Sequence, residues 1–387
     1  MEFEEVNADP FSTEERVALR EMVRSFAEKE IVPNIDEWER IGLLPRELHE
    51  RAAEIGLLGI EFDESIGGSG GDSIDFFTMA EELTYAGRSS GLIMSLFAHR
   101  IALAPIVSQG GPLLVDQFVR PTLAGTAIAA FAVTEPGGGS DVAALRTTAR
   151  REGDFYVVNG AKIFISSAVR ADFIVAAVRT GGSGYGGISL LVIPSDTPGF
   201  EVVRKLDKMG WDCSDTADLA FTDVRVPVAN LIGAENEGFR MLTELFLSER
   251  LGQAAIAYST AQRCLDLAEE WCRQRSTFGK PLMSRQLVRH KITEMAHAVD
   301  VARTYTRQII RRVAAGEILV PQVCMAKRQS TDACSFVADA ALQLHGGTGY
   351  MRDTEINRHY RDARVMSIAG GTNEMMSETV AKWMGYV

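Results

Sequence analysis

The chain has 387 residues, of which 46% are hydrophobic, and its formal net charge at pH 7 is -12. This length suits two or three domains with a large core. The acidic balance argues against a general binder of nucleic acid or of anionic membranes. The five cysteines form no CxxC pair and no framework with the histidines, so we expect reduced thiols in a cytoplasmic protein and no metal site.

The sequence predicts neither a targeting segment nor a membrane span. The first residues, MEFEEVNADP, lack the basic and apolar regions of a secretory signal and the arginines of a transit peptide. We also expect no apolar run near the roughly 18 residues that a membrane span requires.

Residues 1–127 predict an N-terminal helical domain. Helices are expected at 13–31, capped by Ser12 or Thr13, and at 45–55 and 73–86. A glycine-rich loop at 66–72 separates the last two.

The hydrophobic period changes at about residue 128, and residues 128–235 predict a middle β domain, a small barrel or sandwich. Strands 155–158 and 162–165 are expected to pair through a hairpin turn at Asn159-Gly160. Further strands are expected at 173–178, 188–193, 200–203 and 219–221, and the glycine-rich residues 181–187 fit a hairpin loop.

Long helical patterns return in residues 236–387, at 237–274, 286–315, 322–344 and 373–384. Four such helices predict an antiparallel bundle. The expected fold class is therefore α+β, with an N-terminal helical domain, a middle β-barrel or sandwich and a C-terminal four-helix bundle.

Glu249 occupies an unusual place for a carboxylate in the first of these long helices. The apolar stripe of that helix includes Phe239, Leu242, Leu245 and Phe246. Spacings of three, four and seven residues lead from this stripe to Glu249. Lost hydration raises the pKa of such a carboxylate toward that of a working general base, and Gly252 leaves room beside it for a ligand. The alternative is a structural glutamate, paired with Arg250 or capped by Gln253 at a subunit contact.

Three motifs are suited to a phosphate-bearing aromatic ligand. A glycine-rich turn, FAVTEPGGGSD, covers residues 131–141, and a basic segment, RQRSTFGK, covers 273–280 and is followed by Gln286. The third motif is QLHGGTGY at 343–350, with GGTNE at 370–374 beyond it. Each has a structural alternative, namely a bare turn, a polar helix end, or a core histidine at His345.

Together these motifs resemble the acyl-CoA dehydrogenase family, and the resemblance covers essentially the whole chain. Segment 208–227, KMGWDCSDTADLAFTDVRVP, is similar to the family's end of the β domain. The resemblance implies an enzyme that removes an α-proton and a β-hydride from an acyl-CoA thioester, giving a trans-2-enoyl-CoA in fatty-acid or branched-chain amino-acid catabolism. It also implies bound FAD, an electron-transferring flavoprotein as acceptor, and a homotetramer.

The resemblance assigns FAD contacts to the β domain and to the C-terminal helices. These are Phe131, Val133, Thr134, Gly139, Ser140, Phe164, Ile165, Ser166, Arg275, Phe278, Gln286, Gln343, Leu344, Gly346, Gly347, Thr372 and Glu374. Of these, Arg275, Phe278 and Gln286 would reach FAD across a subunit contact. The chain departs from many members at Phe164, Ser166 and Leu247, where they carry Trp, Thr and Asp.

The resemblance places substrate contacts at Ser140, Phe246, Arg250, Gly370 and Gly371. One large group of the family carries its catalytic base at the position of Gly370, which has no side chain. The long-chain and isovaleryl branches carry it on the helix entering the bundle, as Glu-Arg, and Glu249-Arg250 matches that arrangement. The backbone N–H of Gly370 and a ribityl hydroxyl of FAD would polarise the thioester oxygen.

Two alternatives stay open. An acyl-CoA oxidase would pass electrons to oxygen, although such oxidases usually carry a further C-terminal domain. A non-catalytic flavoprotein scaffold could keep the fold without the activity.

Overall fold

The computed structural model describes residues 9–386, so most of the N-terminal segment searched for targeting signals lies outside the described residues. The N-terminal part is helical, as expected. Its helices are α1 (Glu14–Phe26), α2 (Ile35–Ile41), α3 (Glu47–Glu54), α4 (Ser73–Ala86), α5 (Gly91–Leu96), α6 (His99–Gln109), α7 (Pro112–Leu114) and α8 (Arg120–Leu123), with π-helical turns η2 (Ala27–Ile31) and η4 (Val115–Val119).

Local capping explains where the predicted helices begin. The Thr13 hydroxyl accepts from the Arg16 N–H at 3.4 Å and starts α1, which continues through η2 to residue 31. Asp72 and Asp75 form a reciprocal capping box at the start of α4, with bonds of 2.9 and 2.8 Å. These two helices were therefore predictable from nearby residues alone.

A mixed β-sheet forms the middle of the chain. Its strands are β1 (Ala129–Ala132), β2 (Thr148–Glu152), β3 (Phe155–Ser166), β4 (Phe173–Arg179), β5 (Ile188–Pro194), β6 (Phe200–Lys205), β7 (Thr216–Pro227) and β8 (Leu231–Ile232). The order is β6-β7-β3-β2-β4-β5-β8, and β1 pairs with β4 in parallel. Strands β4 and β5 are joined by the predicted hairpin loop.

The hairpin expected at Asn159-Gly160 is wrong, because β3 runs straight through both residues. Asn159 pairs with Thr148 of β2, and a bulge against β7 falls between Val158 and Gly160. A Cβ at Gly160 would lie 2.5 Å from the Thr147 hydroxyl, so the glycine permits a close strand contact here. The β2–β3 turn lies earlier, around Gly153, which has a φ of +62°.

The two halves of the sheet share one hydrophobic core, as the expected barrel or sandwich requires. This core combines side chains of β3 and β7 with others of β1, β4 and β5. The opposite face of β4 and β5 packs on α6, η4 and the start of α9. The first turns of the long α9 helix are thus anchored to the β domain.

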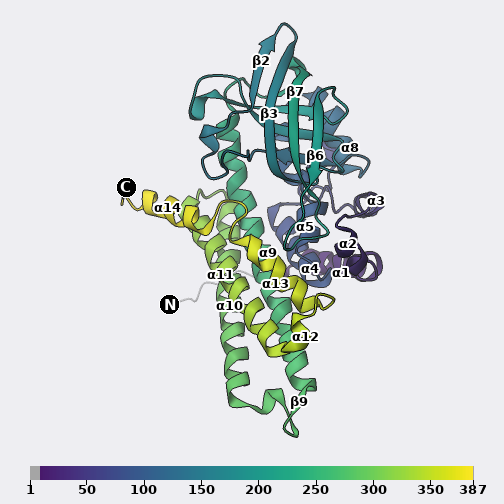
Figure 1. Cartoon of the computed structure of the whole chain (residues 1–387), viewed down its shortest axis with the longest axis vertical. Helices are drawn as coiled ribbons and strands as arrows, with labels where there is room; N and C mark the ends of the chain where they lie inside the picture. Colours follow the sequence, from purple (N-terminus) through teal and green to yellow (C-terminus); the bar gives the residue numbers. More distant parts are fainter. Residues whose placement is uncertain (1–8, 387) are drawn as a thin grey trace.

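The C-terminal part is again helical. Its elements are α9 (Gly238–Gln274), the hairpin β9 (Ser276–Thr277) and β10 (Lys280–Pro281), then α10 (Gln286–Ala314), α11 (Val320–His345), α12 (Gly347–Tyr350), α13 (Glu355–Met366) and α14 (Asn373–Trp383). Helices α9, α10 and α11 pack on one another, and α13 packs on both α9 and α11. The bundle is therefore present, but α13 was missed. The terminal helix α14 contacts α11 and points away from the bundle (Figure 1).

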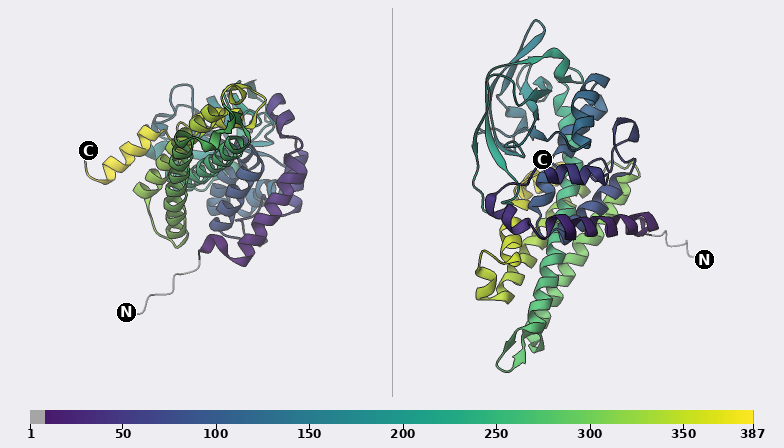
Figure 2. Two further views of the ribbon diagram at one scale, coloured as in Figure 1. Left: turned by 90° about the horizontal axis from the view of Figure 1, so that it is seen from below. Right: turned by 90° about the vertical axis from the view of Figure 1, so that its right-hand side faces the viewer.

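Helix α9 connects the parts of the molecule. It leaves the β domain at one end and reaches the β9–β10 hairpin at the other (Figure 1), while the N-terminal helices lie beside its middle (Figure 2). Residues 251–261 of α9 are all buried, whereas 245–250 are all half-buried. The segment between the β domain and the bundle is thus incompletely covered.

We expected no apolar run of membrane-spanning length, but one stretch of the chain is long and apolar enough when judged by length and composition only. Residues Gly91–Gln109 have a mean hydropathy of 1.5 over a membrane-spanning length, with 61% of that stretch buried inside the protein. In the structure the stretch is split into α5 and α6 at residues 97–98. We interpret it as core packing.

Candidate functional site

The turn after β1 presents backbone without covering side chains. Side chains added at Gly137 or Gly138 would meet no atom within 4 Å, and the following Gly139 and Ser140 are exposed. The Glu135 carboxylate fixes the base of the turn by accepting from the Arg146 and Thr147 N–H groups at 2.6 and 2.9 Å. The turn can therefore receive a ligand closely against its backbone.

A buried ion pair supports this turn from below. Lys162 is fully buried, and its ammonium donates to the Val133 carbonyl and the Glu135 carboxylate, both at 2.9 Å. Burial lowers the pKa of Lys162 to about 8, and Glu135 opposes that shift. Burial alone would raise the pKa of Glu135, but the charge of Lys162 and the hydrogen bonds from Lys162, Thr147 and Arg146 together lower that pKa.

Phe164 lies beside the turn in a strained conformation. Its φ is +62°, unusual for an aromatic residue, and its side chain is 64% exposed. A register shift of β3 between Lys162 and Ile165 produces this outward position. The Ile163 N–H donates to the Thr134 carbonyl at 2.9 Å, so the predicted cofactor residues of β1 and β3 are neighbours. Ile165 points instead into the β core, leaving only its backbone for a ligand.

The β1 group continues onto α9. Phe131, Val133 and Phe246 pack at the edge of one hydrophobic cluster. Phe246 lies one helical turn before Glu249 and Arg250, and the Arg250 guanidinium stands 5.9 Å from the centre of its ring. The structure thus brings the predicted flavin-side residues of the β domain toward the predicted base.

Glu249 is a half-buried carboxylate that makes no ion pair among residues 9–386. Burial raises its pKa, while the cationic side chains of Arg250, Lys327 and Arg100 act in the opposite direction. A side chain added at the buried Gly252 would meet nothing within 4 Å, so the expected room next to the helix exists. A carboxylate of this kind can accept a proton from a ligand.

Gln253 connects Glu249 to the loop of residues 370–372. In one orientation of its amide, the nitrogen donates weakly to Glu249 at 3.4 Å. In the orientation that satisfies both ends of the amide, the nitrogen donates to the Ala369 carbonyl at 2.8 Å and the oxygen accepts from the Gly370 N–H at 3.2 Å. The second arrangement leaves Glu249 without this partner.

The loop itself is held by two cations. Arg250 donates to the Gly370 carbonyl at 3.4 Å, and the buried Lys327 donates to the Gly371 carbonyl at 2.9 Å. Both glycines have positive φ, +63° and +90°. Thr372 then caps α14 by accepting from the Met375 N–H at 3.3 Å. The exposed Glu374 lines a shallow groove between α11 and α14.

The other predicted cofactor residues lie at the far end of the bundle. Arg275, Phe278 and Gln286 surround the β9–β10 hairpin, where Phe278 is 97% exposed. The end of α11 lies near the same hairpin, because His345 of α11 stacks on Trp271 of α9 with ring centres 5.0 Å apart. The predicted cofactor residues at this end of α11 are Gln343, Leu344, Gly346 and Gly347. Along α9, Arg275 lies about 39 Å from Glu249. One chain therefore does not bring this group to the base.

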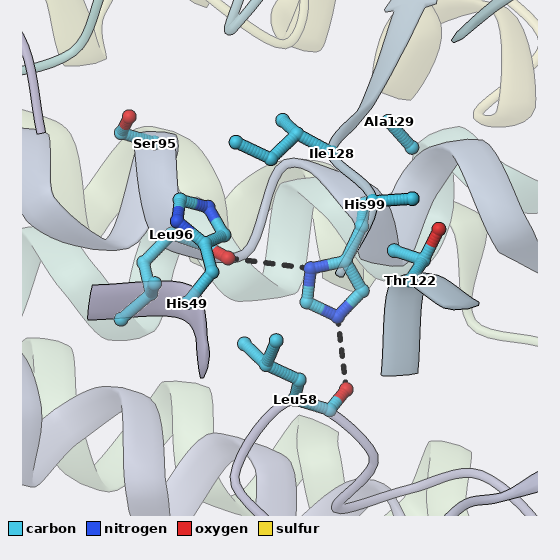
Figure 3. Close-up of a pocket in the computed structure, with 9 residues that line it drawn as sticks. His49, Leu58, Ser95, Leu96, His99, Thr122, Ile128 and Ala129 are labelled. Carbon is cyan, nitrogen blue, oxygen red and sulfur yellow. Dashed lines mark hydrogen bonds between the residues drawn. The ribbon is translucent and has the colours of Figure 1, made fainter. Parts of the chain in front are cut away.

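A second pocket, between the N-terminal helices and the β domain, has no room for a ligand (Figure 3). Both ring nitrogens of His99 face carbonyl oxygens, Leu96 at 3.2 Å and Leu58 at 2.9 Å. Burial, then the charge of Arg170, lowers the pKa of the neighbouring His49 to about 3. Within residues 9–386, no cluster of three or more histidine, cysteine or acidic side chains could hold a metal ion.

Sequence reasoning missed two buried lysines around the site and the loop contact of Gln253. Lys162 and Lys327 were overlooked because lysine is rarely fully buried. Gln253 was noted only as a possible cap of Glu249. A lysine within an otherwise apolar strand or helix face is the signal that could have identified the first two.

Domain profiles of known families match almost the whole chain. The acyl-CoA dehydrogenase N-terminal domain matches residues 13–126, the middle domain 130–224 and the C-terminal domain 236–385.

Curated relatives align along nearly their full length. The rat (Rattus norvegicus) mitochondrial long-chain specific acyl-CoA dehydrogenase is 37% identical over 375 residues, covering 96% of this chain and 86% of that protein. The mouse (Mus musculus) mitochondrial short-chain specific acyl-CoA dehydrogenase is 35% identical over 364 residues, covering 94% and 88%.

Solved structures share the fold. A probable acyl-CoA dehydrogenase from Mycobacterium abscessus is 58% identical with a TM-score of 0.96, and the match covers 97% of this chain and 100% of that one. The prolyl acyl carrier protein oxidase AnaB is 26% identical with a TM-score of 0.92, covering 97% and 100%. From the three domain matches and these relatives, we conclude that the chain belongs to the acyl-CoA dehydrogenase family of oxidoreductases.

Proposed function

We propose that this chain oxidises the α,β bond of an acyl-CoA thioester to a trans-2-enoyl-CoA, with Glu249 as the catalytic base. One observation carries the proposal. Glu249 is a half-buried carboxylate without an ion pair among the described residues, and its pKa is raised by burial. Gly252 leaves open space beside it, and its neighbours Arg250 and Gln253 contact the backbone of Gly370. In contrast, an acidic residue with a purely structural role would be expected to have a close cationic partner.

The proton step follows from these side chains. The Cα–H bond of the substrate breaks, and the Glu249 carboxylate holds the proton while the α,β double bond forms. The α-proton of a thioester is too weakly acidic for a free carboxylate, so the thioester oxygen needs positioned donors. The Gly370 N–H is the backbone donor that we propose, and Gln253 must release it when the thioester arrives.

We assign FAD to the surface made by β1, its turn and Phe164. The fit rests on the open backbone at Gly137 and Gly138 and on the strained, exposed aromatic ring beside them. When bound, FAD supplies the acceptor for the β-hydride. In this assignment Phe164 excludes water from one face, and Thr134 and Ser140 orient the ligand through hydrogen bonds.

We propose that a second copy of the chain completes the cofactor site. The group around Arg275 and the end of α11 cannot reach the Glu249 region of the same chain, since about 39 Å of helix separates Arg275 from Glu249. Phe278 is 97% exposed at a φ of +52°, and the Arg285 guanidinium stands 6.0 Å from its ring centre, so most of the ring is open to a second chain. A homotetramer is the assembly that we propose.

For the substrate, we propose short branched or longer acyl chains over butyryl-CoA. The support is the position of the base on α9 rather than at Gly370. Sequence identity does not distinguish a long-chain from a short-chain preference, because the long-chain and short-chain relatives are 37% and 35% identical to this chain. Screening acyl-CoA thioesters for anaerobic bleaching of the flavin absorbance tests this, and best activity on butyryl-CoA would refute it.

For the electrons, we propose an electron-transferring flavoprotein as acceptor. An oxidase is the second candidate. The match to the AnaB oxidase covers all of that chain, so an oxidase of this fold need not carry a further domain and chain length does not separate the two. We further propose a cytoplasmic location, which is supported by five buried cysteines without disulfides.

A further inference from the structure

We propose that Lys327 is a positioning residue for the reaction, tying the Gly370–Gly371 loop to α11 and placing a positive charge on the bundle side of Glu249. This inference rests on the proposed role of Glu249 as base. Lys327 lies on α11, outside every motif that the sequence singled out.

The hydrogen bonds of Lys327 show what its ammonium holds. The side chain is fully buried, and it donates to the Gly371 carbonyl at 2.9 Å and to the Asn373 side-chain oxygen at 3.2 Å. Asn373 begins α14 and also bonds Thr331 of α11. A single buried cation thus ties the loop and the following helix start to the bundle.

The loop needs such a restraint. Gly370 and Gly371 have φ values of +63° and +90°. Glycine loses more conformational freedom than any other residue when folding fixes its backbone, so two adjacent glycines are costly to hold in one conformation. The Gly370 N–H points at Gln253 only while the loop keeps this conformation. Without Lys327, the Gly371 carbonyl would lose its buried donor, and the loop would keep only its contacts with Arg250 and Gln253.

The charge of Lys327 also acts on the base. The Lys327 ammonium bonds Gly371, and the adjoining Gly370 contacts Arg250 and Gln253, which are the chain neighbour of Glu249 and the residue one helical turn beyond it. From this place the positive charge of Lys327 opposes the burial that raises the pKa of Glu249. Burial, followed by the nearby Arg250, lowers the pKa of Lys327 to about 8, so the ammonium carries its charge at neutral pH. Other charges around this pair come from α6, α11 and α14: Arg100, Asp332 and Glu374.

A loss of charge at this site should change the titration of Glu249. Removing a nearby cation disfavours a carboxylate, so the pKa of Glu249 should rise. The rate of flavin reduction, which needs the carboxylate, should then fall more at acid pH than at alkaline pH. A lysine that only supported packing would leave this pH profile in place.

The experiment compares Lys327→Met and Lys327→Gln with wild type. Lys327→Gln keeps a donor for Gly371, so it tests the charge even if Lys327→Met does not fold. Lys29→Met is the control, because Lys29 is 79% exposed and far along the chain in η2. Two measurements are made, namely the pH profile of flavin reduction and the infrared titration of Glu249, identified by subtracting the Glu249→Gln spectrum.

We expect the acid limb of the rate and the infrared titration to move to higher pH in both Lys327 variants, and not in Lys29→Met. We also expect Lys327→Met, if it folds, to lose more rate than Lys327→Gln at every pH. An unmoved titration in Lys327→Gln with a normal rate would overturn the proposal. That failure differs from failure of the base assignment, which would appear as wild-type flavin reduction in Glu249→Gln itself.

Discussion

The side-chain amide of Gln253 lies against the backbone of Gly370, with its oxygen 3.2 Å from the Gly370 nitrogen. Gln253 is one helical turn beyond Glu249 on α9. This amide therefore lies between Glu249, the base that we propose, and Gly370, the position at which one large group of the family carries its base.

We predict that Gly370→Glu alone will not rescue Glu249→Gln. A Cβ at Gly370 would lie 2.5 Å from the end of the Gln253 side chain, and a φ of +63° is unfavourable for glutamate. Adding Gln253→Ala should make room for the new carboxylate and raise the rate of flavin reduction at least about tenfold above that of Glu249→Gln. Loss of a general base typically costs roughly 10²–10⁴ in rate, so this would be a partial recovery. The control is Glu249→Gln with Gln253→Ala only. Equal recovery in this control would show that the new carboxylate does nothing.

Removing the carboxylate should also stabilise the protein above neutral pH. The folded pKa of Glu249 is raised above its unfolded value of about 4.5, so its ionised form costs stability. This cost is absent below the unfolded pKa, grows as pH rises toward the folded pKa, and is complete above it. Glu249→Gln should therefore raise the Tm at pH 8 more than at pH 5.

Glu244→Gln is the matched control for thermal unfolding, because Glu244 lies on the same helix with its side chain 63% exposed. Its Tm should change little at either pH. A lower Tm for Glu249→Gln at pH 8 would instead support the alternative that Glu249 is a stabilising structural residue.

Arg275→Ala should weaken flavin binding without weakening the chain's own fold. Among residues 9–386, the Arg275 side chain makes no ion pair, and it is exposed. Loss of a charge-assisted hydrogen bond to a pyrophosphate costs roughly 1.5–3 kcal/mol, or about 10- to 150-fold in affinity. Flavin content per chain measures this, with Arg273→Ala as control. Full retention of flavin would contradict a contact between subunits at this residue.

Substrate-reduced protein should reoxidise slowly in air and rapidly with an electron-transferring flavoprotein. The expectation follows from the proposed dehydrogenase activity, in which the bound acyl chain and Phe164 exclude water and small molecules from the flavin. Stopped-flow absorbance with air-saturated buffer checks it. Reoxidation in air at turnover rates would favour the oxidase instead.

Local signals made much of this fold predictable. Thr13 marked a helix start because capping involves residues only three apart, and the Asp72–Asp75 capping box is a local signal of the same kind. The Asn159-Gly160 pair misled because a glycine that allows a tight turn can also adopt a φ of +152° at a bulge within a long strand. Helix α13 was missed because its buried face also includes polar residues such as His359 and Asp362, which a search for apolar residues passes over.

The site was predictable only in pieces. The stripe on α9 pointed to Glu249 because its period is set by one helix. In contrast, the buried environment of Lys327 depends on α14 and on the loop of residues 370–372, more than 40 positions away. The half-buried state of residues 245–250 likewise depends on what other elements leave uncovered.

The most direct test of the account is the rate of anaerobic flavin reduction by an acyl-CoA substrate in Glu249→Gln. The substitution keeps shape and hydrogen bonding but removes basicity, so the rate should fall by roughly 10²–10⁴ while acyl-CoA still binds and the flavin stays in place. Reduction at nearly the wild-type rate would contradict Glu249 as the base.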